Sequence, residues 1–325
     1  RDGYSAYNPR GWIDGNLYIS IGTLLVFAKI CQKSSSSKNA LHESRHQPEA
    51  SSINQTMAIP QRICFVVTSP FTIRVFMLRH LEALAARYDV TVIYNPAESP
   101  GIPLHFDSRI RLIELDINRR ISLWDDLAGF FSLLRIFRRE RFFVVHTITP
   151  KAGLLGQIAA WIERVPFRVH TFTGQVWVTR QGIFRFILKM VDKLYAACAT
   201  HVLVDSPSQR DFLVEQGILP DGRGLVLGGG SISGVDVERF APDTLSRQKI
   251  RGQLGIPEDA VLFLYVGRLK RDKGLLDIAE AFSQHAQHRP DSWWLIVGPD
   301  EEMLAPAIMD CCARVSNRLQ ILGYT

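Results

Sequence analysis

The sequence predicts an α/β protein built from two doubly wound domains, the second of them incomplete. Three observations lead to this fold class. Apolar runs of strand length alternate with segments of helical period between residues 63 and 227, a glycine-rich break follows at 228–236, and the alternation restarts at 261. Strands that alternate with helices form a mostly parallel sheet covered on both faces. A chain of 325 residues suffices for about two such domains.

The first domain is expected to span residues 57–235. Apolar runs predict its strands at 63–67, 90–94, 110–115, 143–146, 167–171, 201–204 and 225–227. Helical periodicity predicts its helices at 74–87, 122–139, 152–162, 184–197 and 207–216. Ser206 before Pro207, and Thr149 before Pro150, each put a hydroxyl at a helix N-cap and a proline in the first turn. Both pairs follow a strand, so both helices should begin at the carboxyl edge of the sheet, where such folds bind ligands.

The second domain is expected to span residues 236–325. Its predicted strands are 261–266, 293–297 and 319–322, and its predicted helices are 274–285 and 303–314. Three strands are roughly half of an ordinary doubly wound domain, which is why we expect this one to be incomplete. The glycines of 228–236 suit either a hinge or a plain flexible linker, and the sequence leaves both open.

Residues 1–56 are expected to be a poorly ordered extension and linker. Residues 34–37 are all serine, and the polar stretch around them has no hydrophobic period. The most apolar run here, 17–28, falls short of the roughly 18 to 20 residues that a membrane-spanning helix needs. It suits a surface-lying helix or a leader segment better than a membrane span.

Composition narrows the function classes. With 46% hydrophobic and 22% charged residues, the chain is neither collagen-like nor wholly disordered. The net charge of +6, from 38 basic and 32 acidic side chains, favours anionic partners such as phosphates or a lipid surface, and is too diffuse to indicate nucleic acid. The five cysteines are scattered and match no zinc spacing, so we expect no metal site and a cytoplasmic location.

Missing motifs exclude several enzyme classes. Thr68, Ser69, Pro70 and Phe71 follow the first predicted strand, where a dinucleotide fold would carry G-x-G-x-x-G, so a nicotinamide or flavin site is not expected. The chain also has no H-E-x-x-H, P-loop or G-x-S-x-G motif. Metalloprotease, P-loop NTPase and α/β-hydrolase activities therefore have no support.

A basic turn follows the first strand of the second domain. Arg268 stands at the end of that strand, and Lys273 stands at the start of the next helix. Two cations and the positive end of a helix would then meet at one place, which suits a diphosphate. The alternative is a solvated basic loop, and neighbouring Lys270 and Arg271 show that some of these charges are simply exposed.

Two polar segments follow strands of the first domain, H-T-I-T-P-K-A-G at 146–153 and H-T-F-T-G-Q-V-W at 170–177. Their hydroxyls, histidines, Lys151 and Gln175 suit hydrogen bonding to a polyhydroxylated or phosphorylated ligand. A histidine at a strand end can equally be a hydrogen-bonded structural residue, so His146 and His170 keep both interpretations.

Two predicted helices combine apolar and basic residues. Residues 130–143 hold four arginines and five phenylalanines, and residues 183–195 are similar in character. Such helices could lie on an anionic membrane, or pack their apolar face on the sheet and leave their cations in water.

Several motifs of the chain resemble those of a known family. V-G-R-L-K-R-D-K-G, W-W-L-I-V-G-P and I-L-G-Y-T look like the nucleotide-binding half of the family 4 (group 1) glycosyltransferases, which have two Rossmann-like domains in the GT-B architecture. H-T-I-T-P-K-A-G-L-L-G, H-T-F-T-G-Q-V-W, V-D-S-P-S-Q-R-D-F-L and G-S-I-S-G-V-D-V-E-R-F fit the other half. The resemblance covers about residues 62–325, and many of these enzymes build bacterial exopolysaccharide, capsule or O-antigen.

The resemblance implies that the first domain binds an acceptor and the second a nucleotide sugar, with a UDP-sugar as the expected donor. Arg268 and Lys273 match the positions that hold the donor diphosphate. The other implied donor residues are Gly267, Gly298, Gly323, Tyr324, Gly234 and Asp236. The expected acceptor residues are Thr68, Ser69, His146, Thr173 and Gln175, and the catalytic candidates are His170 and Lys151. The family retains anomeric configuration and needs no cofactor or metal.

The implied function is transfer of a sugar to a lipid-linked or saccharide acceptor in cell-surface polysaccharide synthesis, at the inner face of the cell membrane. The family's pair of glutamates would lie beyond Thr325, so this chain alone is expected to be weakly active or inactive. A UDP-sugar 2-epimerase of the same architecture and a non-catalytic nucleotide-sugar binding protein remain as alternatives.

Overall fold

The computed structural model describes residues 61–99, 107–120 and 122–323. The extension predicted at residues 1–56 lies outside this part of the chain. The chain divides into two compact units, with the division between Phe240 and Ala241. Each unit is described by itself.

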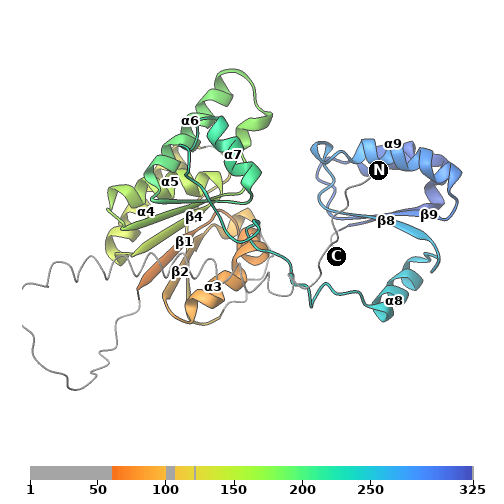
Figure 1. Ribbon diagram of the computed structural model, residues 1–325, viewed down its shortest axis with the longest axis horizontal. Helices are drawn as coiled ribbons and strands as arrows, with labels where there is room; N and C mark the ends of the chain where they lie inside the picture. Colours follow the sequence, from red (N-terminus) through yellow and green to blue (C-terminus); the bar gives the residue numbers. More distant parts are fainter. Residues whose placement is uncertain (1–60, 100–106, 121, 324–325) are drawn as a thin grey trace, which may run out of the picture. The chain divides into compact units, whose positions relative to one another are not determined.

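The first unit is built on a seven-stranded, all-parallel sheet with the order β3-β2-β1-β4-β5-β6-β7 (Figure 1). Its strands are β1 (Arg62–Val66), β2 (Asp89–Tyr94), β3 (Ile110–Glu114), β4 (Val144–Ile148), β5 (Phe167–Phe172), β6 (His201–Val204) and β7 (Leu225–Val226). Parallel strands need helical crossovers between them, as the alternating sequence pattern predicts. The α/β fold class is therefore confirmed.

The helices of this unit are α2 (Pro70–Thr72), α3 (Leu78–Ala85), α4 (Leu123–Glu140), α5 (Pro150–Ile162), α6 (Gly182–Cys198) and α7 (Pro207–Glu215), with short turns η3 (Pro96–Glu98) and η4 (Val176–Thr179). A π-helical turn, η2 (Ile73–Met77), joins α2 to α3. The helical segment starts four residues before the predicted start at residue 74. Ser69 causes this early start, because its hydroxyl accepts from the Phe71 amide and Pro70 occupies the first turn.

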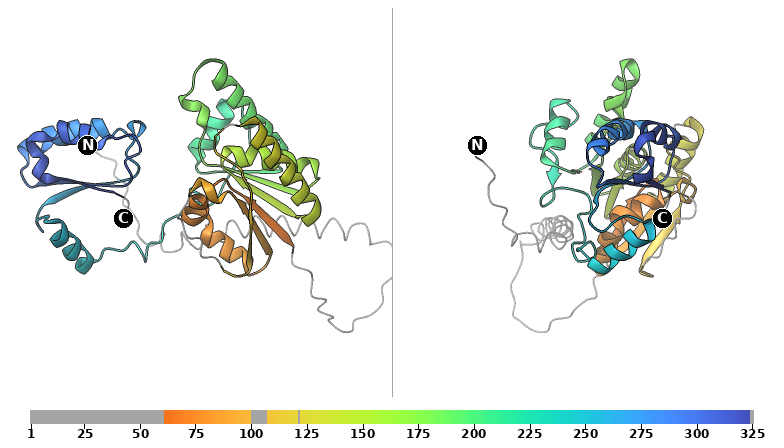
Figure 2. Two further views of the ribbon diagram at one scale, coloured as in Figure 1. Left: turned by 180° about the vertical axis from the view of Figure 1, so that it is seen from behind. Right: turned by 90° about the vertical axis from the view of Figure 1, so that its right-hand side faces the viewer.

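Alternate residues of β1 face two separate cores. Ile63 and Phe65 pack with α3 in one apolar cluster, while Cys64 and Val66 pack with α4 and α5 in another. Figures 1 and 2 show α3 on one face of the sheet and α4 and α5 on the other. The central strand is thus buried on both sides, which explains its continuous apolar run.

The two predicted helix caps differ in outcome. The Ser206 hydroxyl accepts from the Gln209 amide at 3.1 Å, as predicted. The Thr149 prediction is wrong, because this residue adopts a φ of +77° and its side chain caps no amide. Its hydroxyl accepts instead from Thr68 on the neighbouring strand connection, at 3.3 Å. A tertiary contact has replaced the local one.

The second unit has a three-stranded parallel sheet in the described residues, with the order β10-β9-β8. Its elements are α8 (Thr244–Leu254), β8 (Val261–Val266), η5 (Arg271–Lys273), α9 (Leu275–His288), β9 (Ser292–Val297), α10 (Ala305–Cys311), η6 (Ala313–Arg318) and β10 (Leu319–Leu322). The strands match their predictions closely. Helix α8 was not predicted, because its sequence is polar almost throughout; Asp243 caps its first turn, and Arg251 donates to the carbonyls of Pro257 and Ala260.

Candidate functional site

The turns after β8 and β9 bring two glycines into contact. The Gly267 amide donates to the Val297 carbonyl at 2.9 Å, and Gly298 has a φ of +143°. A Cβ at Gly298 would lie 2.0 Å from the Gly267 carbonyl oxygen, so only glycine fits there. Leu322 pairs with Val297 in register, and the Gly298 amide donates to the Leu322 carbonyl, so Gly323 follows at the same edge. The three glycines therefore lie at one edge of the sheet, where the turns after β8 and β9 pack tightly against each other.

The two predicted diphosphate cations flank this edge. The Arg268 guanidinium is half-exposed and lies 3.4 Å from the Glu301 carboxylate, which Lys270 also contacts at 3.1 Å. Lys273 ends η5 two residues before α9, is exposed, and has no ion pair within the described part of the chain. The structure therefore brings Gly267, Arg268, Gly298 and Gly323 to one edge, with Lys273 in the next turn. Tyr324 lies outside the described residues.

The turn after β1 is held by its own hydroxyls. Thr68 and Ser69 are almost fully buried. Thr68 donates to Thr149, and the Ser69 hydroxyl lies 2.9 Å from the Ser99 hydroxyl. Both side chains fix the conformation of the carboxyl edge, and their acceptor-binding role stays a prediction.

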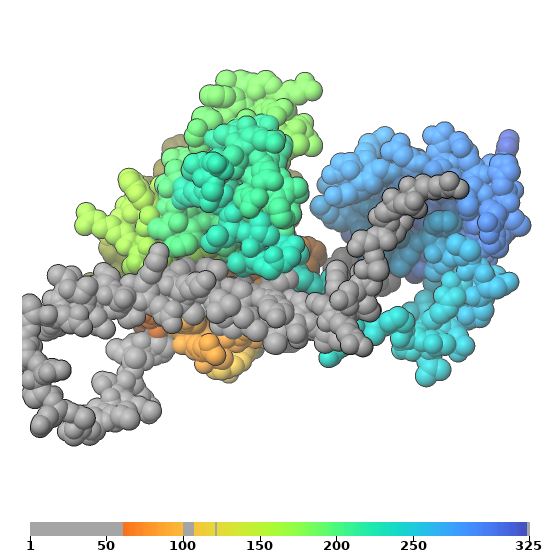
Figure 3. Space-filling model, viewed as in Figure 1, coloured from red at the N-terminus to blue at the C-terminus, as the bar shows by residue number. Residues whose placement is uncertain are grey.

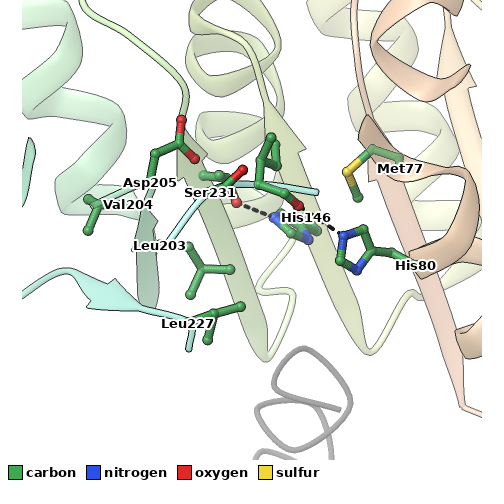
Figure 4. A pocket seen from close by; sticks show the side chains of 10 residues that line it. Met77, His80, His146, Leu203, Val204, Asp205, Leu227 and Ser231 are labelled. Carbon is green, nitrogen blue, oxygen red and sulfur yellow. Dashed lines mark hydrogen bonds between the residues drawn. The ribbon is translucent and has the colours of Figure 1, made fainter. Parts of the chain in front are cut away.

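A pocket opens beside the carboxyl ends of β4, β5 and β6, with about 410 Å³ of empty space that is partly open to solvent. Figure 4 shows His80, His146, Asp205 and Ser231 around it, with Met77, Leu203 and Leu227 supplying apolar walls. One oxygen of Asp205, Oδ1, is buried and has no hydrogen-bond partner among the described residues. Burial raises the pKa of this carboxyl. It offers an acceptor to a hydroxyl or amine in the pocket.

His146 joins two strands at this pocket. Its Nε2 lies 2.8 Å from the Thr171 hydroxyl on β5, and its ring packs 5.0 Å from that of Phe65. Burial, and secondarily the nearby His80, lower the pKa of His146 to about 3. The ring is therefore neutral at physiological pH and lines the pocket as a polar, uncharged group.

His170 lies deeper, between β5 and the helices that cover it. The ring is 1% exposed and packs against Phe172 and Tyr195, with centroids 4.8 and 4.6 Å away. Burial, then the charge of His146, lower its pKa to about 3. The catalytic role predicted for His170 stays a prediction, and these surroundings favour a packing role instead.

His170 belongs to a buried hydrogen-bond network. Gln157 donates from Nε2 to the Thr147 hydroxyl and to the Val169 carbonyl, at 2.7 Å each. The Thr147 hydroxyl lies 2.8 Å from His170 Nδ1, and the tautomer of the ring decides which of the two donates. Gly153 leaves room for the ring, since a Cβ there would lie 2.7 Å from His170 Cε1.

Lys151 forms an ion pair within the first unit. Its ammonium lies 2.6 Å from the Asp126 carboxylate and also donates to the Arg120 carbonyl. These bonds tie the start of α5 to the start of α4. The catalytic role predicted for Lys151 stays a prediction.

The loop after β5 carries the two remaining acceptor candidates. Thr173 is exposed, and Gly174 has a φ of +150°. The Gln175 amide nitrogen is buried and has no hydrogen-bond partner within the described residues. A buried N–H without a partner is costly, so this donor suits a ligand oxygen.

Gly234 and Asp236 lie in the segment that leads out of the first unit. Gly234 has a φ of +67°. Asp236 forms an ion pair with Arg79 and accepts from the Arg239 amide at 3.1 Å. The Arg239 amide and then the Arg79 guanidinium lower the pKa of Asp236, so this carboxylate is ionised and locally paired. Its donor-loop role stays a prediction.

The sequence does not indicate His80, Asp205 or Ser231 as site residues. Asp205 directly follows β6, and a polar residue at the carboxyl end of a predicted strand could have marked it as a candidate for ligand binding. His80 lies on α3, and its Nε2 lies 2.9 Å from the Ile232 carbonyl; no sequence spacing links residues so far apart. Ser231 has a φ of +69° and lies at the pocket, where its backbone amide donates a hydrogen bond to the Asp205 carbonyl.

No group of three or more potential metal ligands occurs in residues 61–99, 107–120 and 122–323. Among the helices of these same residues, none is both long and apolar enough to cross a bilayer.

Two doubly wound units, the second with a glycine-lined edge flanked by cations, define a Rossmann-like two-domain protein of the GT-B type. A family model described as "Glycosyl transferase 4-like domain" matches residues 72–230, and one described as "Glycosyl transferases group 1" matches residues 246–311. Together they cover more than half of the chain. The chain belongs to the group 1 glycosyltransferases of GT-B architecture, which confirms the family resemblance.

Two curated relatives of the chain are also glycosyltransferases. The chain is 31% identical over 177 residues to the capsular polysaccharide biosynthesis glycosyltransferase CapM of Staphylococcus aureus, covering 54% of this chain and 46% of the relative. It is 28% identical over 221 residues to the UDP-Gal:alpha-D-GlcNAc-diphosphoundecaprenol alpha-1,3-galactosyltransferase of Escherichia coli, covering 67% and 56%. The chain spans about half the length of these relatives.

Solved structures share the fold. Sucrose-phosphate synthase from Thermosynechococcus elongatus superposes with a TM-score of 0.61 at 20% identity, over 82% of this chain and 71% of that one. Anabaena HepE, in complex with UDP and glucose, superposes with a TM-score of 0.59 at 16% identity, over 82% and 70%.

The contact between the two glycine turns predicts that adding a methyl group at Gly298 strongly destabilises the second unit. Gly298→Ala should lower the free energy of unfolding of the second unit by about 3 kcal/mol or more, because it combines a backbone clash with an unfavourable φ. The measurement is native-state hydrogen exchange of the β9 amides. Gly252→Ala, in α8 with open space around its Cβ position, is the control and should be neutral or slightly stabilising. Equal protection of β9 in both variants would contradict the prediction.

The buried histidines predict a specific pH dependence. Below pH 6.5 the unfolded state binds more protons than the folded state, whose rings titrate near 3, so stability falls as the pH falls. Each ring should cost about 1.4 kcal/mol of unfolding free energy between pH 7.5 and 5.5. Urea titrations at both pH values should show that the free energy of unfolding of His170→Gln falls by about 1.4 kcal/mol less than that of the parent protein.

His288→Gln is the control for this measurement, because His288 is exposed at the end of α9. An unchanged pH dependence in His170→Gln would show that the folded ring takes up a proton readily and is not held neutral.

Proposed function

We propose that this protein transfers a sugar from a UDP-sugar to a lipid-linked or saccharide acceptor during the synthesis of a cell-surface polysaccharide. The observation that carries the proposal is the order of the two family domains, with the glycine-lined, cation-flanked turn lying in the second of them. The relatives support it: one is named for capsular polysaccharide biosynthesis, and another for galactosyl transfer from UDP-Gal to a diphosphoundecaprenol-linked sugar. HepE, which shares the fold, binds UDP.

In this proposal the second unit binds the donor. Gly267, Gly298 and Gly323 line the nucleotide, and Arg268 and Lys273 hold its diphosphate. As the bond from the anomeric carbon to the diphosphate breaks, positive charge develops on the sugar and negative charge on the departing oxygen. Fixed cations favour that transition state over the ground state. The acceptor oxygen forms the new bond with retention, releasing its proton and a nucleoside diphosphate.

The first unit binds the acceptor. Asp205 Oδ1 offers an unpartnered acceptor atom and the Gln175 amide an unpartnered donor, both near the carboxyl ends of the strands. Such a set suits the hydroxyls of a saccharide, which both donate and accept hydrogen bonds. Thr68, Ser69 and His146 shape the same edge, and the His146 ring is itself uncharged.

A membrane surface is the proposed location of the acceptor. Helix α6 buries only Asp192, Tyr195 and Ala196, while its exposed apolar side chains are Ile183, Phe184, Phe186, Ile187, Met190 and Leu194. Figure 3 shows this segment, in green, protruding from the body of the first unit. Arg185 and Lys189 lie over the ring of buried Trp177, at 5.6 and 5.2 Å, and fix cations beside the apolar residues. An apolar surface rimmed by cations fits an anionic bilayer.

Calorimetric titration of UDP into the whole chain tests the donor site. Arg268→Ala and Lys273→Ala should each weaken UDP binding by about tenfold or more, because a hydrogen bond to a charged group contributes about 1.5–3 kcal/mol. Arg271→Ala is the matched control, since this exposed cation lies in the same turn. A similar loss in all three variants would mean that UDP senses only the general positive charge.

Donor consumption separates this activity from its alternatives. A glycosyltransferase consumes a UDP-sugar when acceptor is present and leaves it largely intact otherwise, whereas a 2-epimerase consumes it with no acceptor. UDP binding without consumption under either condition would favour a binding protein.

Vesicle cosedimentation at low salt tests the membrane surface. Phe186→Asp should weaken binding to phosphatidylglycerol-containing vesicles by about tenfold, because it removes an exposed aromatic ring that would enter the bilayer and adds a negative charge that the anionic lipid repels. Leu245→Asp, on α8 of the second unit and 78% exposed against 57% for Phe186, is the control and should bind as the parent does. Absence of vesicle binding by the parent protein would remove the membrane from the proposal.

A further inference from the structure

A group of arginines gathers at the amino-terminal edge of the first sheet, away from the carboxyl ends of the strands. Arg62 begins β1, Arg111 lies near the start of β3, and Arg135 and Arg139 lie in the last two turns of α4. They surround Glu140, whose Oε2 lies 3.2 Å from Arg62 and 3.0 Å from Arg111; Arg139 lies 3.7 Å from its Oε1. Three elements therefore deliver cations to one place.

Some of these cations form a groove. Arg111, Arg135 and Arg139 line it together with Ile113, Ile136 and Glu140, and it holds about 670 Å³ of empty space that includes open solvent. Ile113 and Ile136 are half-buried and pack on the core beneath, so they give the groove an apolar floor. The groove lies between the edge strand β3 and the outer side of α4.

The positive charge here exceeds what the fold itself uses. Glu140 is engaged by Arg62 and Arg111, and Asp89 also pairs with Arg62 at 3.3 Å. Arg135 forms no ion pair in the described residues, and it stands one helical turn from Arg139, an arrangement in which like charges destabilise a helix.

The helix dipole accounts for only part of this surplus. It favours cations in the last turn, but Arg138 already occupies that turn and pairs with Glu163 at 2.8 Å. Arg111 comes from a strand, and Arg135 stands more than a turn before the end of α4. Their positions on the groove remain unexplained by the fold.

We propose that this groove binds a phosphate-bearing ligand, such as a phosphate monoester or diphosphate with an apolar group attached. Guanidinium groups match phosphate oxygens in bidentate geometry, and three of them converge here around an opening. The isoleucine floor accommodates the apolar group. The site differs from the proposed donor site, whose cations lie in the second unit, so the two can fail independently.

The test is a titration of the whole chain with pyrophosphate, followed by the methyl NMR signals of Ile113 and Ile136. These methyls should shift on binding, and Arg135→Gln/Arg139→Gln should weaken that response by about tenfold or more. Arg180→Gln/Arg314→Gln removes the same charge from exposed positions away from the amino-terminal edge of the first sheet and should change the affinity by less than about twofold. Arg268→Ala should leave the shifts of these two methyls unchanged.

Dihexanoyl phosphatidic acid, used as a monomer, distinguishes the two sources of the phosphate. Tighter binding than pyrophosphate would identify a phospholipid headgroup whose chains lie on the isoleucine floor. Equal or weaker binding would identify a soluble phosphate ester. Equal losses of affinity in the groove variant and its charge-matched control, or no shift of the two methyls, would overturn the proposal.

Discussion

The first unit depends on the parallel pairing of β1 between β2 and β4. Because β1 is buried on both faces, every strand beside it must return through a helix, and those helices must cover both sides of the sheet. Parallel pairing also sends all carboxyl ends to one edge and all amino ends to the other. The polar pocket and the arginine groove therefore lie at opposite edges of one sheet, although their residues alternate along the chain.

Burial sorts the polar residues of the carboxyl edge into two groups. A buried polar group without a partner costs about 1–3 kcal/mol, so most are satisfied internally. Thr147, Gln157 and His170 form a buried network in which the low pKa of the ring keeps it neutral and only Gln157 Oε1 has no hydrogen-bond partner among the described residues. Asp205 and Gln175 also keep one such atom each. Asp205 differs from Gln157 because it lines the pocket, which residue type does not reveal.

Some surface features of the two units indicate where binding partners contact the protein. Gly267 and Gly298 lie so close that a side chain at Gly298 would clash with the Gly267 carbonyl, and this contact fixes the two turns against each other. Helix α6 presents most of its apolar residues outward, whereas Ala152, Leu155, Ala159 and Ala160 of α5 fill a core. Apolar and charged groups placed where the fold makes no use of them are the best indication of partners in this molecule.

The sequence by itself determined the fold class, nearly every strand and the family, because strand runs, helical periods and turn motifs are local patterns. It missed α8, since a polar helix held by a cap and by Arg251 has no apolar period. It proposed Thr149 as a cap, which a contact from Thr68 overrode. Only the tertiary structure decided which polar residues are buried and paired, and which distant residues share a pocket or groove. Burial and proximity arise from packing between segments far apart in the chain, and no local pattern encodes them.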